Sequence, residues 1–600
     1  MSDSIERQTC LASFNDRCNK NTLFLQGTGL YTSMRNEEVA WIFHELAEML
    51  EFKEEDFFKI RAYKNAARIL AELEEPLEEI RLRGDLTKIP GIGKNIAAKI
   101  NEVLTTGRLQ KLEDLSKEIP PGLLDIMSLP GIGPKRAALF RDSLGITSLG
   151  ELAKAARAGR VRDLPGMGRK TERDIIRFIE MLADRGGRVL LATANILVDE
   201  LKRYLKTLPG VADVEAGGSV RRWRDTVGDI DLVVAAGDPG PVMDAVTAYP
   251  RISEVLERSG NRLNLQTKWG ITVDIEVVPE EQFTLALFLN TGSRAHLSKL
   301  ENYLADKGFN IKTAVSRSGG VFRDEREIYS SLDLPYIPPE MREDLGEVEA
   351  ASQNRLPRLL ELEDIKGDLH IHTTWSDGLS TIEQAVKRAR EKGYSYMALT
   401  DHSQSLRIAR GLSLDKLKEQ HEEIRSLNEK LDDFTVFTGI EVDILPRGGL
   451  DCPEEILKGV DLVIASVHSA FKQDSDTMTA RIISAVENKN VDIIGHLTGR
   501  LINHREAYAL DLEKVLDASA RCGTILEINA SPERLDLNDC NARRAKEKGI
   551  KMAVNTDAHD LKRMDEMSYG VSVARRAWIE PGDVVNTMPV GKMIKYIRKR

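Results

Sequence analysis

Cysteine is scarce in this chain of 600 residues, and the few present lack the spacing of a metal or disulfide framework. The five are Cys10, Cys18, Cys452, Cys522 and Cys540. Because they include no CxxC pair, we expect neither a disulfide-stapled scaffold nor a cysteine zinc knuckle. No apolar run approaches the ~20 residues that span a bilayer, and residues 1–33 lack the basic start and apolar core of a signal peptide. We therefore expect a cytoplasmic protein without a membrane segment, in which residues 1–33 form a disordered extension.

Positive charge is not spread over the whole chain. The formal net charge is −10, which argues against a uniformly basic nucleic-acid binder. Two stretches depart from this balance: residues 81–111 hold seven Lys and Arg against two acids, and residues 131–170 hold nine against three. Any nucleic-acid contact is therefore expected in these two stretches. The length itself predicts about four domains.

Both basic stretches contain a repeat, in which an apolar–Pro–Gly–apolar–Gly segment leads into a basic helix start. Its copies are IPGIGKNIAAKI from Ile89, LPGIGPKRAALF from Leu129 and LPGMGRKTERDI from Leu164. The glycines permit a tight turn, and exposed N–H groups at the following helix start can bind phosphate. The alternative is a Pro–Gly turn between packed helices, but three basic copies favour phosphate contact. The pattern resembles the helix-hairpin-helix motif, which holds the DNA backbone without reading bases. The residues expected at DNA are Gly91, Gly93, Lys94, Gly131, Gly133, Lys135 and Arg136.

A second pattern occupies residues 217–234, GGSVRRWRDTVGDIDLVV. Asp229 and Asp231 begin an apolar run, and residues i and i+2 of a strand point to one face. A third acid, Asp274, lies in another apolar run, GITVDIEVV. Three carboxylates can hold two Mg²⁺ ions in the geometry of in-line phosphoryl transfer. An isolated DxD pair is common on surface strands, but the preceding Gly–Gly–Ser turn and two arginines favour a phosphate site.

Eight of the ten histidines lie after residue 365, and most of them end short apolar runs. The polar residues at these run ends are His370, His372, Asp377, His402, Glu441, His468, His496, Glu527, Asn529, Asp557 and His559. Amphipathic, helix-like stretches separate the runs, so strand and helix alternate. Side chains at the carboxyl ends of parallel strands meet at one end of a barrel, and imidazole with carboxylate suits zinc, manganese or iron. One such His is usually structural, whereas recurrence in six of seven runs predicts a multi-metal hydrolase. His421 lies in a charged helical stretch, where we expect it to be solvated.

These segments together resemble the bacterial and archaeal family X DNA polymerases that carry a C-terminal PHP (polymerase and histidinol phosphatase) domain. The resemblance covers about residues 34–600 and implies a multidomain α+β and α/β chain. Helical helix-hairpin-helix domains come first, then a nucleotidyltransferase palm with a thumb, and then a distorted (βα)7 barrel. The implied domains are 34–114, a DNA-end-binding domain of the 8-kDa type; 115–186, fingers with two helix-hairpin-helix motifs; 187–288, the palm; 289–345, the thumb; 346–364, a linker; and 365–600, the PHP barrel.

In the palm, the resemblance implies that Asp229, Asp231 and Asp274 bind Mg²⁺ (or Mn²⁺) and that Asp274 helps activate the primer 3′-hydroxyl. The positions implied to hold the incoming nucleotide are Gly218, Ser219, Arg222, Gly228, Thr291, Gly292 and Ser293. The chain departs from the family at Leu289-Asn290, where an aromatic Tyr-Phe pair usually packs beneath the sugar. Glu301 also stands where some relatives place an Arg near the template. The first departure predicts weak rejection of ribonucleotides.

In the barrel, nine positions match the ligands of a trinuclear PHP site. They are His370, His372, Asp377, His402, Glu441, His468, His496, Asp557 and His559. The resemblance implies three divalent metal ions, with Mn²⁺ favoured and Zn²⁺ or Fe also compatible. It further implies Mn²⁺-dependent 3′–5′ exonuclease activity and related 3′-end trimming. Three arginines lie near ligand-bearing segments: Arg407, Arg410 and Arg534. We expect them either to contact phosphate or to be solvated.

Lys99 falls where 5′-deoxyribose phosphate lyases of the family place their Schiff-base lysine. Nearby cations can activate such a lysine, and Lys59, Lys64 and Lys94 are candidates. Asn95 replaces a second lysine of strong lyases, so binding of a 5′-phosphate is the alternative role. The implied protein is a monomer that fills short gaps in gapped or primed double-stranded DNA from dNTPs, as in base excision repair. A nuclease with a degraded polymerase pocket and a non-enzymatic DNA-end binder are the alternatives.

Overall fold

The structure of the chain, a computed structural model, describes residues 36–598. Within that range it leaves out residues 54, 72, 74, 107–108, 119–120, 128, 130–131, 169–170, 173–174, 177–178, 180–186, 250–251, 268–269, 312 and 314–320. The expected extension 1–33 and the expected DNA contact Gly131 therefore lie outside the described residues. The chain divides into two compact units, Met1–Met181 and Leu182–Arg600, and each is described by itself. Across the described residues, no helix has both the length and the apolar character to cross a membrane.

The first unit is made of short helices around one apolar core. Its elements are α1 (Asn36–Phe52), α2 (Phe57–Ala71), α3 (Leu77–Leu82), the 3-10 turn η1 (Leu86–Lys88), α4 (Lys94–Thr106), α5 (Gln110–Glu118), α6 (Pro121–Met127), α7 (Pro134–Leu144) and α8 (Leu149–Arg157). Phe43, Leu46 and Leu50 recur at helical spacing on α1 and are fully buried. The same apolar cluster continues to Ile175 and Ile179, so all three repeat copies share one core.

Each repeat copy in this unit closes the same turn. The backbone N–H of the fourth residue donates to the carbonyl of the first, from Ile92 to Ile89, from Ile132 to Leu129 and from Met167 to Leu164, at 3.0, 2.9 and 3.0 Å. Gly91 and Gly166 have φ of +86° and +70°, as the third position of a type II turn requires. At Gly91 an added Cβ would also lie 2.5 Å from the Ile69 side chain. Glycine is therefore favoured at this position of the first and third turns.

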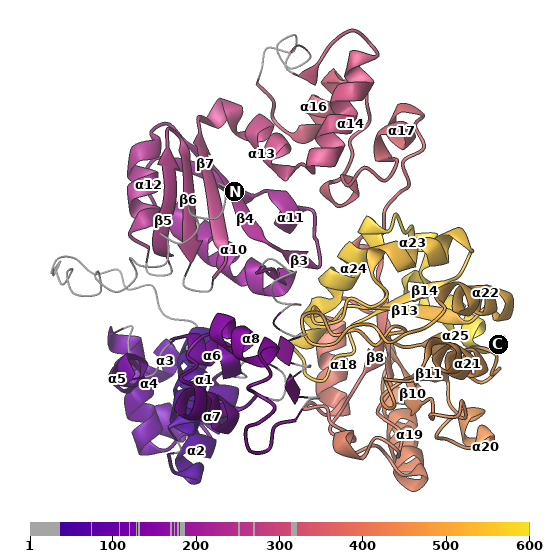
Figure 1. The fold of residues 1–600 in the computed structure, drawn as a ribbon. Helices are drawn as coiled ribbons and strands as arrows, with labels where there is room; N and C mark the ends of the chain where they lie inside the picture. Colours follow the sequence, from indigo (N-terminus) through magenta and orange to yellow (C-terminus); the bar gives the residue numbers. More distant parts are fainter. Residues whose placement is uncertain are drawn as a thin grey trace. The chain divides into compact units, whose positions relative to one another are not determined.

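The second unit begins with a five-stranded sheet, and the strand order is β2-β4-β7-β6-β5. The elements of this palm are β1 (Val189–Leu190), α10 (Leu191–Lys206), β2 (Val211–Ala216), α11 (Gly218–Arg221), β3 (Thr226–Val227), β4 (Asp229–Ala236), α12 (Pro239–Thr247), β5 (Ile252–Ser259), β6 (Arg262–Thr267) and β7 (Thr272–Val278). Strands β4 and β7 pair in parallel and the other neighbours are antiparallel. Strands β1 and β3 form a separate antiparallel pair. The sheet thus brings the two acidic motifs onto adjacent central strands (Figure 1).

A small helical region follows the palm. It comprises η2 (Glu280–Gln282), α13 (Phe283–Thr291), α14 (Arg294–Ala305), α16 (Glu325–Ser331), η3 (Pro339–Met341) and α17 (Glu347–Ser352). Helix α13 runs through position 288/289, the expected boundary between palm and thumb. The guanidinium of Arg342 is fully buried and makes two hydrogen bonds of 2.9 and 2.8 Å to Glu325, which also pairs with Arg221 of the palm. The buried carboxylate of Glu325 therefore helps to fasten the thumb to the palm.

The segment 346–364, expected as a linker, is folded. It contains α17 and the 3-10 turn η4 (Leu362–Asp364), and its Leu359 and Leu360 are buried. The N–H of Leu360 donates to Ile579 O at 2.9 Å. The connection into the last domain is therefore part of the packed structure.

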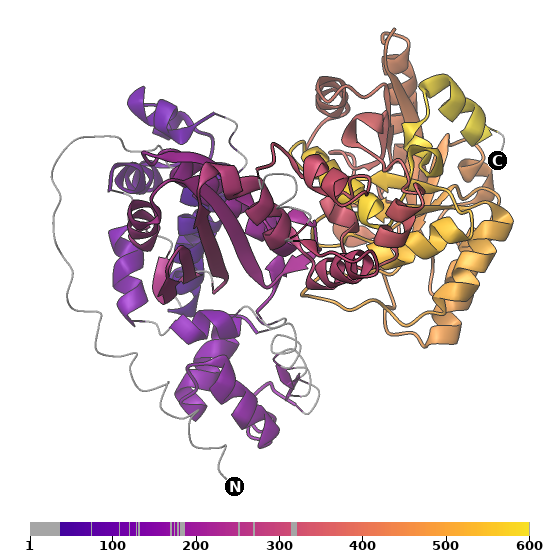
Figure 2. The same cartoon turned by 90° about the horizontal axis from the view of Figure 1, so that it is seen from above.

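The remainder of the second unit is a seven-stranded parallel barrel. Its strands are β8 (Gly367–Ile371), β9 (Tyr396–Leu399), β10 (Thr435–Asp443), β11 (Leu462–Ser466), β12 (Ile493–Ile494), β13 (Ile525–Asn529) and β14 (Met552–Asn555), in sequence order around the sheet. The helices and 3-10 turns are α18 (Ile382–Glu391), η5 (Arg407–Ala409), α19 (Leu414–Asn428), α20 (Glu454–Leu457), α21 (Ser475–Val486), α22 (Leu512–Cys522), α23 (Asp539–Glu547), η6 (Arg563–Glu566), α24 (Met567–Arg576), η7 (Pro581–Asp583), η8 (Val585–Thr587) and α25 (Val590–Arg598). A parallel bridge between Ile371 and Ala558 closes the ring. Figures 1 and 2 show the helices around the outside of the strands.

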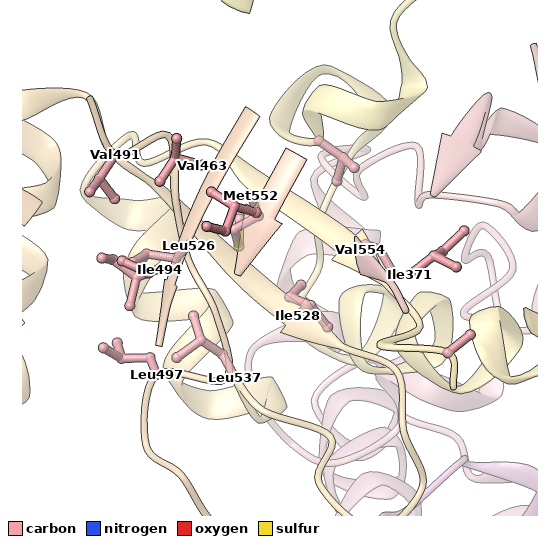
Figure 3. Packing of buried hydrophobic residues seen from close by; sticks show 14 of the residues in the cluster. Ile371, Val463, Val491, Ile494, Leu497, Leu526, Ile528, Leu537, Met552 and Val554 are labelled. Carbon is pink, nitrogen blue, oxygen red and sulfur yellow. The ribbon is translucent and has the colours of Figure 1, made fainter. Parts of the chain in front are cut away.

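Residues of each barrel strand alternate between two apolar layers, as the period of two requires. Val463 and Ala465 belong to the layer between strands and helices, whereas Leu462 and Ile464 face the interior layer. Figure 3 shows part of the outer layer, to which Ile494, Leu526 and Val554 contribute from neighbouring strands. This architecture, with helix-hairpin-helix domains, palm, thumb and (βα)7 barrel, confirms the expected fold class.

The expectation that His421 is solvated is wrong. Its side chain is buried, and Nε2 lies 3.2 Å from the carbonyl of Gly439 on β10. Leu417, Gln420, His421 and Ile424 are the buried residues of α19 and follow helical spacing. His421 therefore lies on the face that packs against the barrel.

Candidate active sites

The palm carboxylates meet because of the register between two parallel strands. Asp231 on β4 lies directly opposite Asp274 on β7, and Asp229 lies two residues earlier on β4. All three can therefore point to one face of the sheet. Asp229 is exposed, and Asp231 and Asp274 are half-buried.

The charge of this cluster is unbalanced. Burial, together with the neighbouring carboxylates of Asp229 and Asp274, raises the pKa of Asp231 to about 7. Arg222 is the cation that opposes this rise. A raised pKa from crowded carboxylates is the state that divalent cations relieve, because each cation stabilises the ionised form. The donor set therefore fits Mg²⁺ or Mn²⁺.

The Gly–Gly–Ser turn wraps closely over β4. The N–H of Gly217 donates to the carbonyl of Asp231 at 2.8 Å. A Cβ at Gly218 would lie 1.7 Å from Oδ2 of Asp231, and its φ of +52° also favours glycine. The hydroxyl of Ser219 is buried and has no hydrogen-bond partner. An orphaned donor beside the carboxylates fits an acceptor such as a phosphate oxygen.

A pocket of about 920 Å³ opens at this turn. The expected site residues that line it are Gly218, Ser219, Arg222, Asp229, Asp231, Gly292 and Ser293. Thr291 does not line it, since its hydroxyl is buried and donates to Leu287 O at 2.6 Å. Gly228 lies behind the wall, against the guanidinium of Arg188. Asp274 lines a smaller neighbouring hollow that shares Asp231 with this pocket.

Arg222 is held by two acceptors at the pocket wall. Its Nη1 donates to Thr291 O at 2.6 Å and its Nε donates to Oε1 of Glu343 at 3.0 Å. Arg188, another of the arginines that line the pocket, donates to the hydroxyl of Thr226 at 3.0 Å. Arg188 and Glu343 were not predicted as site residues, because neither belongs to a motif and both reach the pocket through contacts distant in sequence.

The Leu289-Asn290 pair also faces this pocket. The Leu289 side chain is 43% exposed. The amide of Asn290 turns away to donate to Glu276 at 2.7 Å and to Ala286 O at 2.8 Å. Among the described residues that line the pocket none is aromatic, and Glu301 is one of them.

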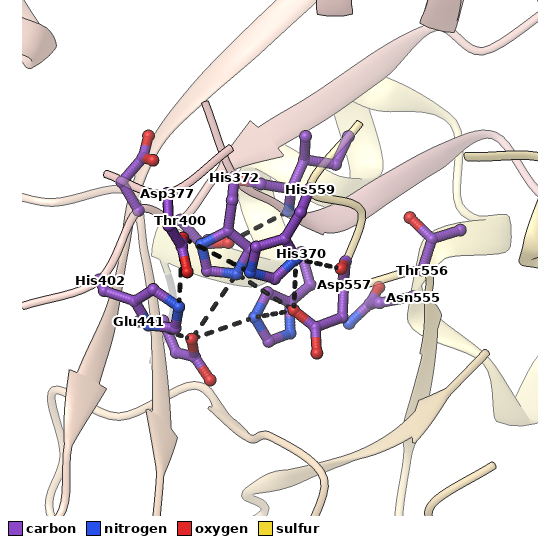
Figure 4. Close-up of polar contacts among 12 residues, drawn as sticks. His370, His372, Asp377, Thr400, His402, Glu441, Asn555, Thr556, Asp557 and His559 are labelled. Carbon is purple, nitrogen blue, oxygen red and sulfur yellow. Dashed lines mark hydrogen bonds and ion pairs between the residues drawn. The ribbon is translucent and has the colours of Figure 1, made fainter. Parts of the chain in front are cut away.

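In the barrel, the expected ligands gather at the carboxyl ends of the strands (Figure 4). Three groups have ligand atoms within 4.8 Å of one another: His372, Asp377, His402 and His559; His370, His372 and Asp557; and His402, Glu441 and His468. His372 and His402 each belong to two groups, so the three candidate positions are neighbours. The ninth residue, His496, has Nε2 at 3.1 Å from Oε1 of Glu441.

Several buried nitrogen and oxygen atoms of this cluster make no hydrogen bond, although some lie close to a carboxylate, as Nδ1 of His402 does at 2.8 Å from Oε2 of Glu441. The orphaned atoms are Nε2 of His370, both ring nitrogens of His372, Nδ1 of His402 and of His496, and Oε2 of Glu441. Burying such groups without partners is costly, and metal ions would supply the missing partner. Burial, with the adjacent His559 and His402, holds the pKa of His372 well below its usual value, which favours the neutral form that binds metal. The donor set therefore fits divalent ions.

Two further carboxylates orient the imidazoles from behind. Oε1 of Glu527 lies 2.7 Å from Nδ1 of His370, and Oδ1 of Asp443 lies 2.7 Å from Nδ1 of His468. The other ring nitrogens are thereby directed at Glu441, at 3.5 and 3.4 Å. Such outer carboxylates fix the tautomer of a metal-binding histidine. Asp443 was missed, although it lies two residues after Glu441 on β10 and so shares its face.

The arginines near this cluster differ in exposure. Arg534 is half-buried, with Nε at 3.7 Å from Oδ2 of Asp557 and a buried Nη1 that has no hydrogen-bond partner. Arg407 and Arg410 are exposed. Arg534 is thus the arginine with an unused donor next to the metal cluster.

The expected DNA contacts lie at helix starts of the first unit. Gly93 and Gly133 precede α4 and α7, and their carbonyls accept the first helical hydrogen bonds, from Ala97 at 2.9 Å and Ala137 at 3.1 Å. Lys94 and Lys135 are exposed, and Arg136 is half-buried. Lys99 is half-buried on α4. Two of the three cations expected to activate it are themselves paired, Lys59 with Glu55 and Lys64 with Glu51.

Comparison with known proteins assigns these parts to described families. Residues 34–109 match a helix-hairpin-helix domain and residues 123–180 a SAM-like helix-hairpin-helix tandem. Residues 286–343 match the DNA polymerase beta thumb, and residues 368–531 match the PHP domain. The matched segments follow one another in the order expected from the sequence.

Individual relatives agree with these matches. The chain is 35% identical over 573 residues to the DNA polymerase/3′-5′ exonuclease PolX of Bacillus subtilis (strain 168), which covers 94% of this chain and 100% of that protein. It is 36% identical over 247 residues to a probable phosphatase of Thermoanaerobacter sp. (strain X514), covering 39% of this chain and 94% of the relative. A probable phosphatase of Acetivibrio thermocellus is 27% identical over 245 residues, covering 39% and 95%. Because the first similarity spans nearly all of both chains, this chain belongs to the family X DNA polymerases that carry a C-terminal PHP domain.

Proposed function

We propose that this chain extends primer 3′ ends across short gaps in DNA and also degrades 3′ ends. The observation that carries the proposal is the presence of two separate metal-binding constellations, one on the palm strands and one in the barrel. A relative that matches over its whole length is named a DNA polymerase/3′-5′ exonuclease. The proposed substrates are gapped or primed double-stranded DNA and dNTPs, and the proposed setting is base excision repair in the cytoplasm by a monomer.

In the palm, Asp229, Asp231 and Asp274 would hold two Mg²⁺ or Mn²⁺ ions. When bound, these ions would supply positive charge to the reacting phosphate and acidify the attacking hydroxyl. Asp274, which lines the neighbouring hollow, would accept the proton of the primer 3′-hydroxyl. The hydroxyl of Ser219 and the guanidinium of Arg222 would bind the triphosphate, and Gly292 and Ser293 would border the sugar.

In the barrel, the nine clustered residues would hold three divalent ions, with Mn²⁺ favoured and Zn²⁺ or Fe also compatible. When bound, these ions would neutralise the phosphodiester and acidify a water molecule. Glu527 and Asp443 hold the imidazoles of His370 and His468 in the orientation that ligation requires. Arg534 directs an unpartnered donor toward this cluster and would bind a phosphate oxygen.

The test is a labelled primer on DNA with a one-nucleotide gap, incubated with Mn²⁺ with and without dNTPs. Wild type should extend the primer when dNTPs are present and shorten it when they are absent. Asp274→Ala should lose extension only, and His372→Ala should lose shortening only. A wild type that shortens but never extends would establish the alternative, a nuclease whose Leu289-Asn290 pocket is a degraded polymerase site. A wild type that binds DNA ends and does neither would establish the non-enzymatic alternative.

Two narrower activities belong to the same proposal. Removal of a 3′-terminal phosphate is favoured by the relatives named probable phosphatases, and a 3′-phosphorylated primer tests it. Schiff-base chemistry at Lys99 is favoured by the position of this lysine on α4, one turn after the first hairpin turn. Borohydride trapping on a 5′-deoxyribose phosphate end tests it, with Lys99→Ala as the control. An untrapped wild type would leave Lys99 the role of binding the 5′-phosphate.

A further inference from the structure

The barrel reaches the nucleotide pocket through one buried arginine. Arg576, on α24, has only 3% of its side chain exposed. Its Nη1 donates to the backbone carbonyl of Arg222 at 2.7 Å and to Oε1 of Glu343 at 3.0 Å. Its Nε and Nη2 donate to Oδ2 of Asp539 at 2.9 and 2.7 Å. The guanidinium thus joins barrel, thumb and palm at a single point.

The same carboxylate oxygen serves the pocket arginine. Oε1 of Glu343 accepts from Nε of Arg222 at 3.0 Å as well as from Arg576. Arg222 is therefore held twice by this arrangement, at its side chain through Glu343 and at its carbonyl directly. Hydrogen bonds between charged groups that exclude water are strong and directional. Such bonds fix the position of a side chain that lines the pocket.

The residues after Arg222 are also docked on the barrel. The ring of Trp223 meets that of Tyr569 edge to face, with centroids 5.6 Å apart. Asp225 accepts from Arg500 at 3.2 Å. Trp223 has φ of +54°, a conformation that a bulky residue adopts only where surrounding contacts enforce it. The loop 222–225 therefore takes its shape from the barrel as well as from the palm.

We propose that Arg576 is a positioning residue for nucleotide addition, by which the PHP barrel presets Arg222 for the triphosphate of the incoming nucleotide. The barrel would then serve the palm in addition to holding its own metal site. The inference rests on the proposed nucleotidyl transfer in the palm. It assigns no contact between Arg576 and the nucleotide.

Arg222 would bind the triphosphate before the reaction begins. Displacing Arg222 should therefore weaken dNTP binding more than it lowers kcat. Arg576→Ala should raise both the KM for dNTP in gap filling and the Kd for dNTP about tenfold, a loss of about 1.4 kcal/mol. The Kd is measured on a primer that ends in a dideoxynucleotide, so that no chemistry occurs. The kcat and the rate of primer shortening should stay close to wild type, and the latter also reports that the barrel is folded.

Arg575 provides the matched control. It is the neighbouring arginine of α24 and bonds the thumb at Glu340 and the connection at Leu360 O, at 2.7 and 3.0 Å, without touching the loop 222–225. Arg575→Ala should leave the Kd for dNTP unchanged. In an Arg222→Ala background, Arg576→Ala should cause no further rise in the Kd for dNTP, because Arg576 acts on the nucleotide through Arg222. Arg576→Lys should restore part of the binding.

Three results would overturn the inference. One is an unchanged Kd in Arg576→Ala, the second is an equal loss in Arg575→Ala, and the third is a full additional loss in the Arg222→Ala background. If Arg576→Ala loses primer shortening and so fails to fold, Arg576→Lys and Asp539→Asn carry the same comparison. A wild type that extends no primer would instead refute nucleotide addition in the palm, and the inference with it.

Discussion

The carboxylate of Glu527 lies 2.7 Å from Nδ1 of His370, which leaves Nε2 of that ring 3.5 Å from both Glu441 and Asp557. One outer carboxylate thus sets which nitrogen is available to a metal ion. Its own hydrogen bonds to the N–H of His496 and the amide of Asn555 keep it in place. Glu527 therefore orients the ligand His370 without being one of the nine expected metal ligands.

Replacing Glu527 by Gln should therefore weaken metal binding without removing a ligand. Loss of such an outer carboxylate costs about 10- to 100-fold in metal affinity. Primer shortening should need correspondingly more Mn²⁺ and recover at high concentration, while gap filling stays unchanged. Isothermal titration calorimetry with Mn²⁺ measures the change in metal affinity. An unchanged Mn²⁺ affinity would show that Glu527 does not orient His370.

Asp231→Ala should abolish gap filling and leave primer shortening nearly unchanged. The reason is that the palm carboxylates and the barrel cluster are built from different strands and would hold separate ions. Extension and shortening of one labelled primer, with and without dNTPs, give both rates. Equal loss of both activities would mean that the two sites do not act independently.

Replacing Lys135 and Arg136 with Ala should weaken DNA binding alike for all sequences. Both residues follow a hairpin turn at the start of α7, where backbone phosphate contacts are expected. Each lost phosphate contact reduces the magnitude of the negative slope of log K against log salt by about 0.9 on duplex DNA. Binding measured at several salt concentrations on two unrelated sequences tests this. A loss confined to one sequence would contradict a backbone contact.

Sugar selection should be weak, because no aromatic ring stands at Leu289-Asn290 and the Asn290 amide is bonded to Glu276. The ratio of kcat/KM for dNTP to that for the matching rNTP measures it in gap filling. Replacing the pair with Tyr and Phe should raise this ratio. Strong discrimination by wild type would show that another part of the pocket excludes the 2′-hydroxyl.

Acid should loosen the thumb from the palm. Burial alone would raise the pKa of Glu325, but its bonds to Arg342 and Arg221 outweigh burial and lower it to about 2. A lowered pKa stabilises the folded state above the unfolded value of about 4.3, and this contribution disappears as pH falls toward 2. The contribution is about 3 kcal/mol at neutral pH. Denaturant unfolding of wild type between pH 6 and 3 should show the decline.

Glu325→Gln gives the control for that decline. This variant should lose stability at neutral pH, because Arg342 is left buried without its charge partner. It should also lose the part of the pH dependence that belongs to Glu325. If its stability falls with pH as steeply as that of wild type, other carboxylates cause the acid effect.

Residues that end strands could be predicted from the sequence, because the strand period and the parallel order place them together without any knowledge of packing. The barrel positions are of this kind, whereas Asp229 and Asp231 begin β4 and were predicted from their spacing of two. Glu343 could not be predicted, because its contact with Arg222 joins residues 121 apart through the folding of the thumb. Arg576 is equally remote from any motif, and Trp223, although it lies within residues 217–234, has a contact with Tyr569 that no sequence pattern indicates.

His421 shows a different limit. The charged residues around it suggested solvation, yet the buried positions of α19 repeat at intervals of three and four residues and include it. Spacing was the better guide than local charge, since one face of an amphipathic helix is buried whatever its neighbours carry.

The ring of barrel strands is closed by the N–H of His372 bonding to Ala558 O at 2.9 Å, so residues from both ends of the domain share one metal centre. During synthesis, His370 and His372 leave the ribosome almost two hundred residues before Asp557 and His559. Domains fold as units once their chain has emerged. A growing chain can therefore acquire the helix-hairpin-helix domains and the palm while its hydrolytic centre is still incomplete, and a prematurely terminated chain cannot degrade DNA.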